Sequence, residues 1–142
     1  MVDVVGTWRA VEWRVDYSDG SPAVFPYGDD IDGLFCAAPD GWMNLSLFCR
    51  SAPTIAPEKQ TKELEKVGAL GGFVNYGGRW DVQGEDLVFT VLHAMYPAFV
   101  GSQQRRRMTF HADSRLALSA TQLPPGETVS RIHALSWRRA TR

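Results

Sequence analysis

Short runs of alternating hydrophobic and polar residues extend over most of the chain, and turn-forming residues separate one run from the next. Alternation with a period of two is typical of a β-strand with one buried face, and clusters of Gly, Pro, Asp and Ser mark turns. The sequence therefore predicts eight strands, at residues 4–17, 31–38, 41–50, 73–82, 87–96, 103–111, 116–122 and 128–139.

Most neighbouring strands are expected to form hairpins, because the segments between them are short and suited to tight turns. Pro39, Asp40 and Gly41 form one such turn, and Gly84 lies at the centre of another. Strands joined in this way favour an all-β, eight-stranded antiparallel up-and-down barrel, whose interior is wide enough for one small ligand. A β-sandwich of similar length is the alternative architecture.

Residues 57–70 have a different pattern, which predicts one short helix. Pro57 suits a first helical turn, Glu58 and Lys62 are four residues apart, and Gly71 follows the segment. The apolar stripe of this helix is thin, so we expect it to lie on the surface or to cover an opening of the barrel.

The chain has 142 residues, of which 44% are hydrophobic and 22% are charged, and this predicts one soluble domain over residues 1–142. A formal net charge of −1 argues against nucleic-acid binding, because the chain lacks the positive field that gathers polyanions. No apolar run approaches the roughly 18 residues of a membrane span, and the first residues lack a signal-peptide pattern. We therefore expect a cytoplasmic protein with no membrane partner.

Cys36 and Cys49 are expected to be free thiols. If the turn centres on Pro39 and Asp40, Cys36 lies opposite Met43, and Cys49 is about six residues farther along, roughly 20 Å away. A disulfide needs Cα atoms within about 7 Å.

Side-chain alternation predicts which positions face the barrel interior. Across the Gly84 hairpin the less polar row is taken as the inner one: Val74, Tyr76, Gly78, Trp80, Phe89, Val91, His93 and Met95. Around the turn at Pro39 the inner positions are expected to be Leu34, Cys36, Met43, Leu45 and Leu47.

The first and last strands need separate treatment. Trp8 and Trp13 have opposite parity, so both point inward only if a β-bulge lies near Arg9 and Ala10. In the last strand the odd-numbered face, which includes His133, is favoured as the inner one over the even-numbered face.

The chain also carries family motifs. Gly6-Thr7-Trp8 matches the Gly-x-Trp signature of lipocalin-like barrels, and further motifs follow in order: Pro26-Tyr27-Gly28, Ala38-Pro39-Asp40-Gly41-Trp42-Met43, Tyr76-Gly77, Pro97-Ala98-Phe99-Val100-Gly101, Gln104-Arg105 and Trp137. Over nearly its full length the chain resembles the bacterial and fungal lipocalin-like domain family. The resemblance implies a calycin-type barrel whose first Trp packs at the closed end, often under an Arg of the last strand. The family has no single activity, and some of its members lie beside natural-product pathways.

Three residues are candidates for catalysis in the apolar interior. His93 is a candidate general acid or base near pH 7, Tyr76 a proton donor or orienting group, and Arg106 a binding group for an anion. His93 also suits a structural role, bonded to Tyr76, and this role is the favoured one of the two. Arg106 is also compatible with an internal salt bridge to Glu12 or Asp16, or with plain solvent exposure.

The residues expected to bind a substrate are mostly apolar or aromatic: Trp13, Tyr17, Tyr27, Leu34, Met43, Leu45, Trp80, Phe89, Met95 and His133. Tyr27 suits either a contact over the barrel mouth or a loop anchor, and Trp13 and Trp80 also suit the core. The histidines are scattered and no Cys-x-x-Cys, Walker or dinucleotide motif is present, so neither a metal nor a cofactor is expected.

Two functions from different classes fit these features. One is a cofactor-free enzyme, of the cyclase, isomerase or dehydratase type, acting on an apolar or aromatic substrate such as a natural product. The other is a non-catalytic carrier that sequesters a small hydrophobic ligand. We favour the enzyme, because a His-Tyr-Arg set exceeds what passive binding requires. A filled barrel that makes only protein contacts is a third interpretation, and homo-oligomerisation is left open.

Overall fold

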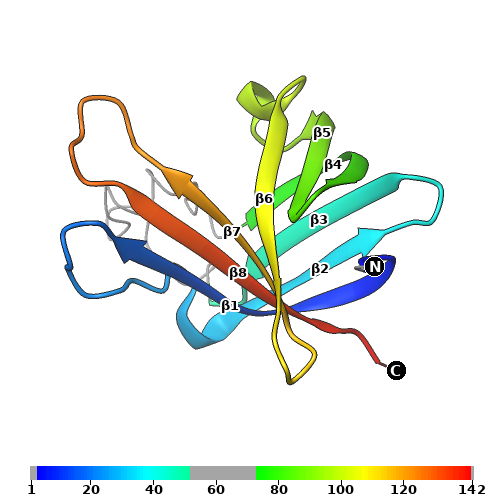
Figure 1. The fold of residues 1–142 in the computed structure, drawn as a ribbon, viewed down its shortest axis with the longest axis horizontal. Coiled ribbons are helices and arrows are strands. Elements are labelled where there is room, and N and C mark those ends of the chain that lie inside the picture. Colours follow the sequence, from blue (N-terminus) through cyan, green and yellow to red (C-terminus); the bar gives the residue numbers. More distant parts are fainter. Residues whose placement is uncertain (1–2, 52–72, 142) are drawn as a thin grey trace.

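The computed structural model describes residues 3–51 and 73–141, which contain one closed antiparallel barrel (Figure 1). Each strand pairs with the next one along the chain, and β8 pairs with β1. The strands are β1 (Gly6–Tyr17), β2 (Ile31–Ala37), β3 (Trp42–Cys49), β4 (Phe73–Gln83), β5 (Asp86–Ala94), β6 (Gln103–Phe110), β7 (Leu116–Gln122) and β8 (Arg131–Arg139). Two short 3-10 turns also occur, η1 (Gly28–Asp30) and η5 (Pro97–Phe99).

This topology confirms the predicted all-β up-and-down barrel and excludes the β-sandwich. The helix predicted at residues 57–70 lies outside the described residues. The loops after β1 and after β7 lie at the left of the view, whereas both chain ends lie toward its right (Figure 1). None of the helices in the described part of the chain is long and apolar enough to cross a membrane.

A β-bulge in β1 lets both tryptophans of this strand point into the barrel. The register of β1 against β8 shifts between Ala10 and Glu12, which leaves Val11 as the extra residue. Trp8 and Trp13 are consequently buried, whereas Val11 is exposed. The bulge expected in this part of the strand is therefore confirmed.

The turn between β2 and β3 contains three residues rather than two. The Ala38 N–H donates to the Trp42 carbonyl oxygen, and Gly41 has a φ of 93°, a left-handed conformation that glycine adopts without strain. Ala37 therefore lies opposite Met43, one position away from the pairing predicted for a two-residue turn.

This shift by one residue reverses the two faces of β2. Phe35 is completely buried, whereas Leu34 is 45% exposed, so the prediction that Leu34 lines the interior is wrong. Cys36 is likewise only half-buried on the outer face. The prediction for β3 is confirmed, because Leu45 and Leu47 are buried.

The hairpin between β4 and β5 has the predicted register from its turn as far as Gly78 and Val91. Beyond this pair, Gly77 lies opposite His93, so Leu92 is an extra residue in β5. A Cβ on Gly78 would collide with the backbone of β5, and glycine is what permits the strands to approach here.

The bulge at Leu92 exchanges the inner and outer faces of the end of β5. His93 is exposed on the outer face, where its ring lies over Gly77 and its Nε2 is 3.5 Å from Asn44 Nδ2. Met95 is 55% exposed. The predictions that His93 and Met95 face the interior are therefore wrong, because one inserted residue exchanges the two faces of a strand.

Arg139 covers Trp8 at one end of the barrel. Its guanidinium carbon lies 4.3 Å from the centre of the indole ring, and its Nη1 and Nη2 donate to the carbonyl oxygens of Val5 and Asp3. The Trp8 indole N–H donates to the Val4 carbonyl oxygen at 3.0 Å. The arrangement implied by the lipocalin resemblance is thus present, with Arg139 as the arginine of the last strand.

Replacing Arg139 with methionine should lower the free energy of unfolding by about 1–2 kcal/mol, because a cation–π contact and two hydrogen bonds are lost. The matched control is Arg138→Met, since Arg138 is exposed and reaches Asp113 only at 3.4 Å. That variant should change stability by less than about 0.5 kcal/mol. Urea unfolding measures both values, and equal losses in the two variants would contradict a specific role for Arg139.

Cys36 and Cys49 are both free thiols, as predicted. Cys36 pairs with Asn44 and Cys49 pairs with Ile31. One cysteine therefore lies near the turn of the β2–β3 hairpin and the other lies at its far end, too distant for a disulfide.

Candidate ligand-binding cavity

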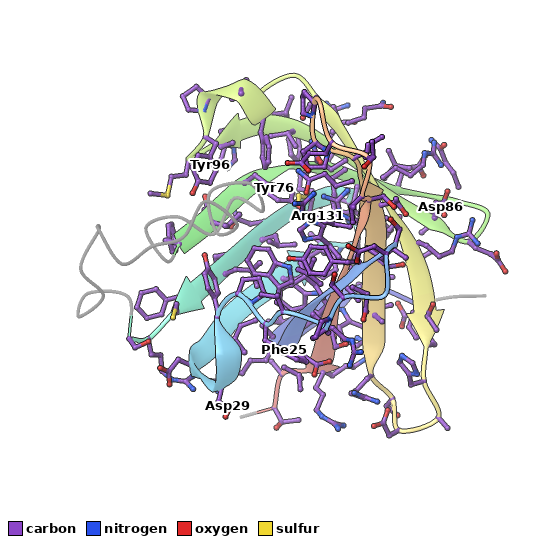
Figure 2. The ribbon with its side chains drawn as sticks, turned by 90° about the vertical axis from the view of Figure 1, so that its left-hand side faces the viewer. Phe25, Asp29, Tyr76, Asp86, Tyr96 and Arg131 are labelled. Atoms are coloured by element: carbon purple, nitrogen blue, oxygen red, sulfur yellow. The ribbon has the colours of Figure 1, made fainter. Side chains whose placement is uncertain are left out.

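A cavity of about 300 Å³ lies inside the barrel. Its walls come from β1, β3, β4, β6, β7 and β8, together with η5 and the residue before it. The aliphatic part of the wall consists of Leu45, Leu47, Val74, Leu118 and Leu135. Figure 2 shows Tyr76 among the inner side chains and Tyr96 beside the η5 turn. A mostly apolar pocket of this size with a few polar groups suits a small organic ligand.

Five of the residues predicted for the site line this cavity: Trp13, Leu45, Tyr76, Arg106 and His133. Each comes from a different strand, so the closure of the barrel is what brings them together. The position of His133 agrees with the inward orientation favoured for the odd-numbered face of β8, which also buries Arg131 and Trp137.

Met43 and Phe89 belong to the buried hydrophobic core, and Trp80 is partly buried and packs against it. Phe89 is completely buried, and its ring centre lies 5.9 Å from that of Tyr76. The Trp80 indole N–H donates to the Ala38 carbonyl oxygen at 2.8 Å. These side chains therefore contribute to the core and are not among the residues that line the cavity.

Tyr17 and Tyr27 also pack with the core and are not among the residues that line the cavity. The Arg131 guanidinium lies 5.4 Å from the centre of the Tyr17 ring. The Tyr27 ring packs edge-on against Trp13, with ring centres 5.1 Å apart. Burial raises the pKa of Tyr27 far above its usual value, so its hydroxyl keeps its proton. This packing favours the interpretation of Tyr27 as a loop anchor.

Arg106 contributes a guanidinium group to the wall. Its Nη1 donates to the Arg105 carbonyl oxygen at 2.9 Å, and its Nη2 donates to Gln104 Oε1 at 3.2 Å. Among residues 3–51 and 73–141, no carboxylate forms an ion pair with Arg106, and Asp16 instead pairs with Arg14 at 3.0 Å. Because a guanidinium has five N–H donors, Arg106 retains donors for a ligand.

The side chain of Gln104 is held in place by further hydrogen bonds. Its Nε2 donates to Ser102 Oγ at 2.8 Å, and Ser102 Oγ donates to the Phe99 carbonyl oxygen at 2.5 Å. The amide oxygen of Gln104 is therefore left to face Arg106. This chain of contacts links the position of the guanidinium to the η5 turn.

Tyr76 places a hydroxyl in the same cavity. Burial raises the pKa of Tyr76, and the positive charge of Arg106 opposes this shift less strongly, so the hydroxyl is protonated at neutral pH. Within the described part of the chain, this hydroxyl has no hydrogen-bond partner. The Tyr76 hydroxyl and the Arg106 guanidinium can therefore both donate to an oxygen acceptor on a ligand.

His133 is held between two neighbours on the wall. The Trp13 indole N–H donates to His133 Nδ1 at 3.2 Å, and His133 Nε2 lies 2.9 Å from Gln122 Oε1. Since an indole nitrogen only donates, Nδ1 must be the acceptor, and the proton of the neutral ring is on Nε2. Both ring nitrogens are thereby occupied within the protein.

Sequence reasoning missed several residues of the wall. Tyr96 and Phe99 reach the cavity because of the bulge in β5 and the η5 turn, which no sequence pattern indicated. Leu118 and Gln122 had a usable signal, since alternation along β7 from the buried Leu116 places both on the inner face.

The family model described as lipocalin-like domain matches residues 5–140. Among solved structures, the chain is similar to an uncharacterized protein from Bacteroides eggerthii, with 15% identity, coverage of 93% of this chain and 98% of that chain, and a TM-score of 0.41. No curated protein matches the chain. The family match extends over the whole barrel, including all the strands that line the cavity.

Proposed function

Because the chain belongs to the family of lipocalin-like domains, we propose that its barrel binds one small apolar or aromatic molecule that carries an anionic group. The observation that carries this proposal is the guanidinium of Arg106, which lines an apolar cavity without a carboxylate partner among the described residues. Arg106 is half-buried, and the cost of removing part of a cation from water is offset when an opposite charge lies beside it. A carboxylate or an enolate on the ligand supplies that charge.

The size and chemistry of the cavity support the rest of the proposal. A volume of about 300 Å³ is at the lower end for organic ligands, so it suits a molecule of one or two rings. The aliphatic and aromatic wall provides contacts for the ring system. Arg106 and the Tyr76 hydroxyl then orient the ligand by donating to its acidic group.

A second candidate function is proton-transfer catalysis without a cofactor, and the observation that favours it is that Tyr76 and Arg106 line the same cavity. A protonated phenol next to a cation can stabilise an enolate. His93 is on the outer face and takes no part in this proposal. A carrier returns its ligand unchanged, whereas an isomerase exchanges a carbon-bound proton with solvent. The ligand is incubated with the protein in deuterated water, and mass spectrometry then shows whether the ligand has taken up deuterium, as expected only for the isomerase.

Titration with a matched pair of probes tests the binding proposal. The anion 2-naphthoate should bind at least about tenfold more tightly than the neutral 2-naphthamide, because only the anion forms charge-assisted hydrogen bonds with Arg106. Calorimetry measures both affinities, and amide chemical-shift changes around Tyr76 and Leu118 should locate the probe. Equal affinities, or shifts confined to the outer surface, would reject the proposal.

A further inference from the structure

Although the barrel is closed, β6 and β7 pair along only part of their length, which leaves a gap in the ladder between them among the described residues. These strands pair only from Arg107, opposite Ser119, to Phe110, opposite Leu116. The first half of β6 pairs with β5 alone, and the second half of β7 pairs with β8 alone. Figure 1 shows the two strands meeting at the lower end of β6 and diverging toward its upper end.

In residues 3–51 and 73–141, the peptide groups along this gap lack ladder partners on the opposite strand. The Met108 N–H donates to the Glu85 carbonyl oxygen, so even-numbered residues of β6 direct their peptide groups to β5 and odd-numbered residues direct theirs to β7. Arg105 therefore points its carbonyl oxygen into the gap, where it accepts from Arg106 Nη1 at 2.9 Å. The guanidinium of Arg106 thus donates to a carbonyl oxygen that faces the gap.

A second hollow, of about 340 Å³, lies at the gap and is lined by side chains of the outer face such as Asp86, Arg105 and Arg107. Arg106, Ala120 and Thr121 line both this hollow and the inner cavity. The same residues can line both the inner cavity and the outer hollow only where the wall between these two spaces is thin or open.

The charges around the outer hollow set Arg106 apart from its neighbours. Arg105 and Arg107 pair with Asp86 at 3.0 Å and 2.8 Å, and Arg107 also pairs with Glu85 at 3.1 Å. Arg106 has carbonyl and amide oxygens as partners instead. For an anion in the outer hollow, the guanidinium of Arg106 is therefore the arginine charge that no described carboxylate compensates, and it lies at the gap.

We propose that the gap between β6 and β7 is a lateral entrance to the cavity, at which Arg106 receives the acidic group of the ligand and holds it there. The apolar part of the ligand enters first and fills the cavity, while the acidic group stays in the wall. This inference rests on the proposed binding function, and it adds the route and the orientation of the ligand.

Stopped-flow binding of 2-naphthoate to two tryptophan variants tests the entrance. Thr121→Trp adds bulk to the exposed edge of the gap, and Thr109→Trp makes the same substitution at an exposed position in the paired half of the β6–β7 ladder. With Thr121→Trp, both the association and the dissociation rate should fall at least about tenfold, and the Kd should change much less than either rate. Thr109→Trp should leave both rates within about twofold of the original protein.

The outcomes separate this inference from the binding proposal. If 2-naphthoate binds and Thr121→Trp leaves both rates unchanged, the ligand enters by another route and the inference is overturned. A rise in Kd with no slower association also overturns it, because Thr121 then only contacts the bound ligand. If 2-naphthoate does not bind the original protein more tightly than 2-naphthamide, the proposed function itself fails.

Discussion

Truncating Phe35 to alanine should lower the free energy of unfolding by about 3–5 kcal/mol, whereas the same change at the neighbouring Leu34 should cost less than about 1 kcal/mol. Phe35 is completely buried, and its ring makes edge contacts with Phe89 and Trp137 at centre distances of 5.5 Å and 5.9 Å. Its removal leaves a cavity in the core. Leu34 is 45% exposed, so its truncation removes few contacts.

Urea unfolding of the two variants measures this difference directly. The pair is a matched control, because the residues are adjacent in β2 and differ mainly in which face of the strand they occupy. The three-residue turn at Gly41 is what puts Phe35 inside. If Leu34→Ala were the more damaging change, the β2–β3 register would be the one expected for a two-residue turn.

Replacing Arg106 with leucine should raise the Kd of 2-naphthoate about 10- to 100-fold, because a charge-assisted hydrogen bond contributes about 1.5–3 kcal/mol. The affinity for 2-naphthamide should change far less, since the neutral probe has no charge for the guanidinium to compensate. Leucine keeps the wall apolar, so the cavity should persist. Calorimetry measures the Kd of each probe, and the change on mutation should be larger for 2-naphthoate than for 2-naphthamide.

Arg9→Leu is the control for this measurement. Arg9 is an exposed arginine of β1 that pairs with Asp32 at 3.1 Å, away from the cavity wall. Its replacement alters the net charge of the protein as Arg106→Leu does, and it should leave both affinities unchanged. Equal losses in the two variants would mean that overall charge, and not a specific contact in the cavity, determines the affinity for the anion.

The order and number of strands could be derived from the sequence, because alternation and turn-forming residues are local properties of the chain. The bulge in β1 was also predictable, since Trp8 and Trp13 can both be buried only if the strand contains an extra residue. The cover of Trp8 by an arginine of the last strand was implied by family motifs rather than by alternation.

The inner faces of β2 and of the end of β5 were decided only by the tertiary structure. Gly41 adds a residue to one turn, and Leu92 adds one to β5. Each single-residue shift reversed a set of predictions, which is why Leu34 and His93 proved to lie outside. Alternation has a period of two, so an error of one residue reverses every side chain that follows.

The sequence did not determine which group is the partner of Arg106. Alternation within Arg105-Arg106-Arg107 indicated that one of the three points away from the other two, but it left a salt bridge, a ligand contact and solvent exposure open. In the tertiary structure Asp86 forms ion pairs with Arg105 and Arg107, whereas Arg106 lines the cavity. The partners of a charge come from strands distant in sequence, and only the closure of the barrel determines which carboxylates lie within reach of it.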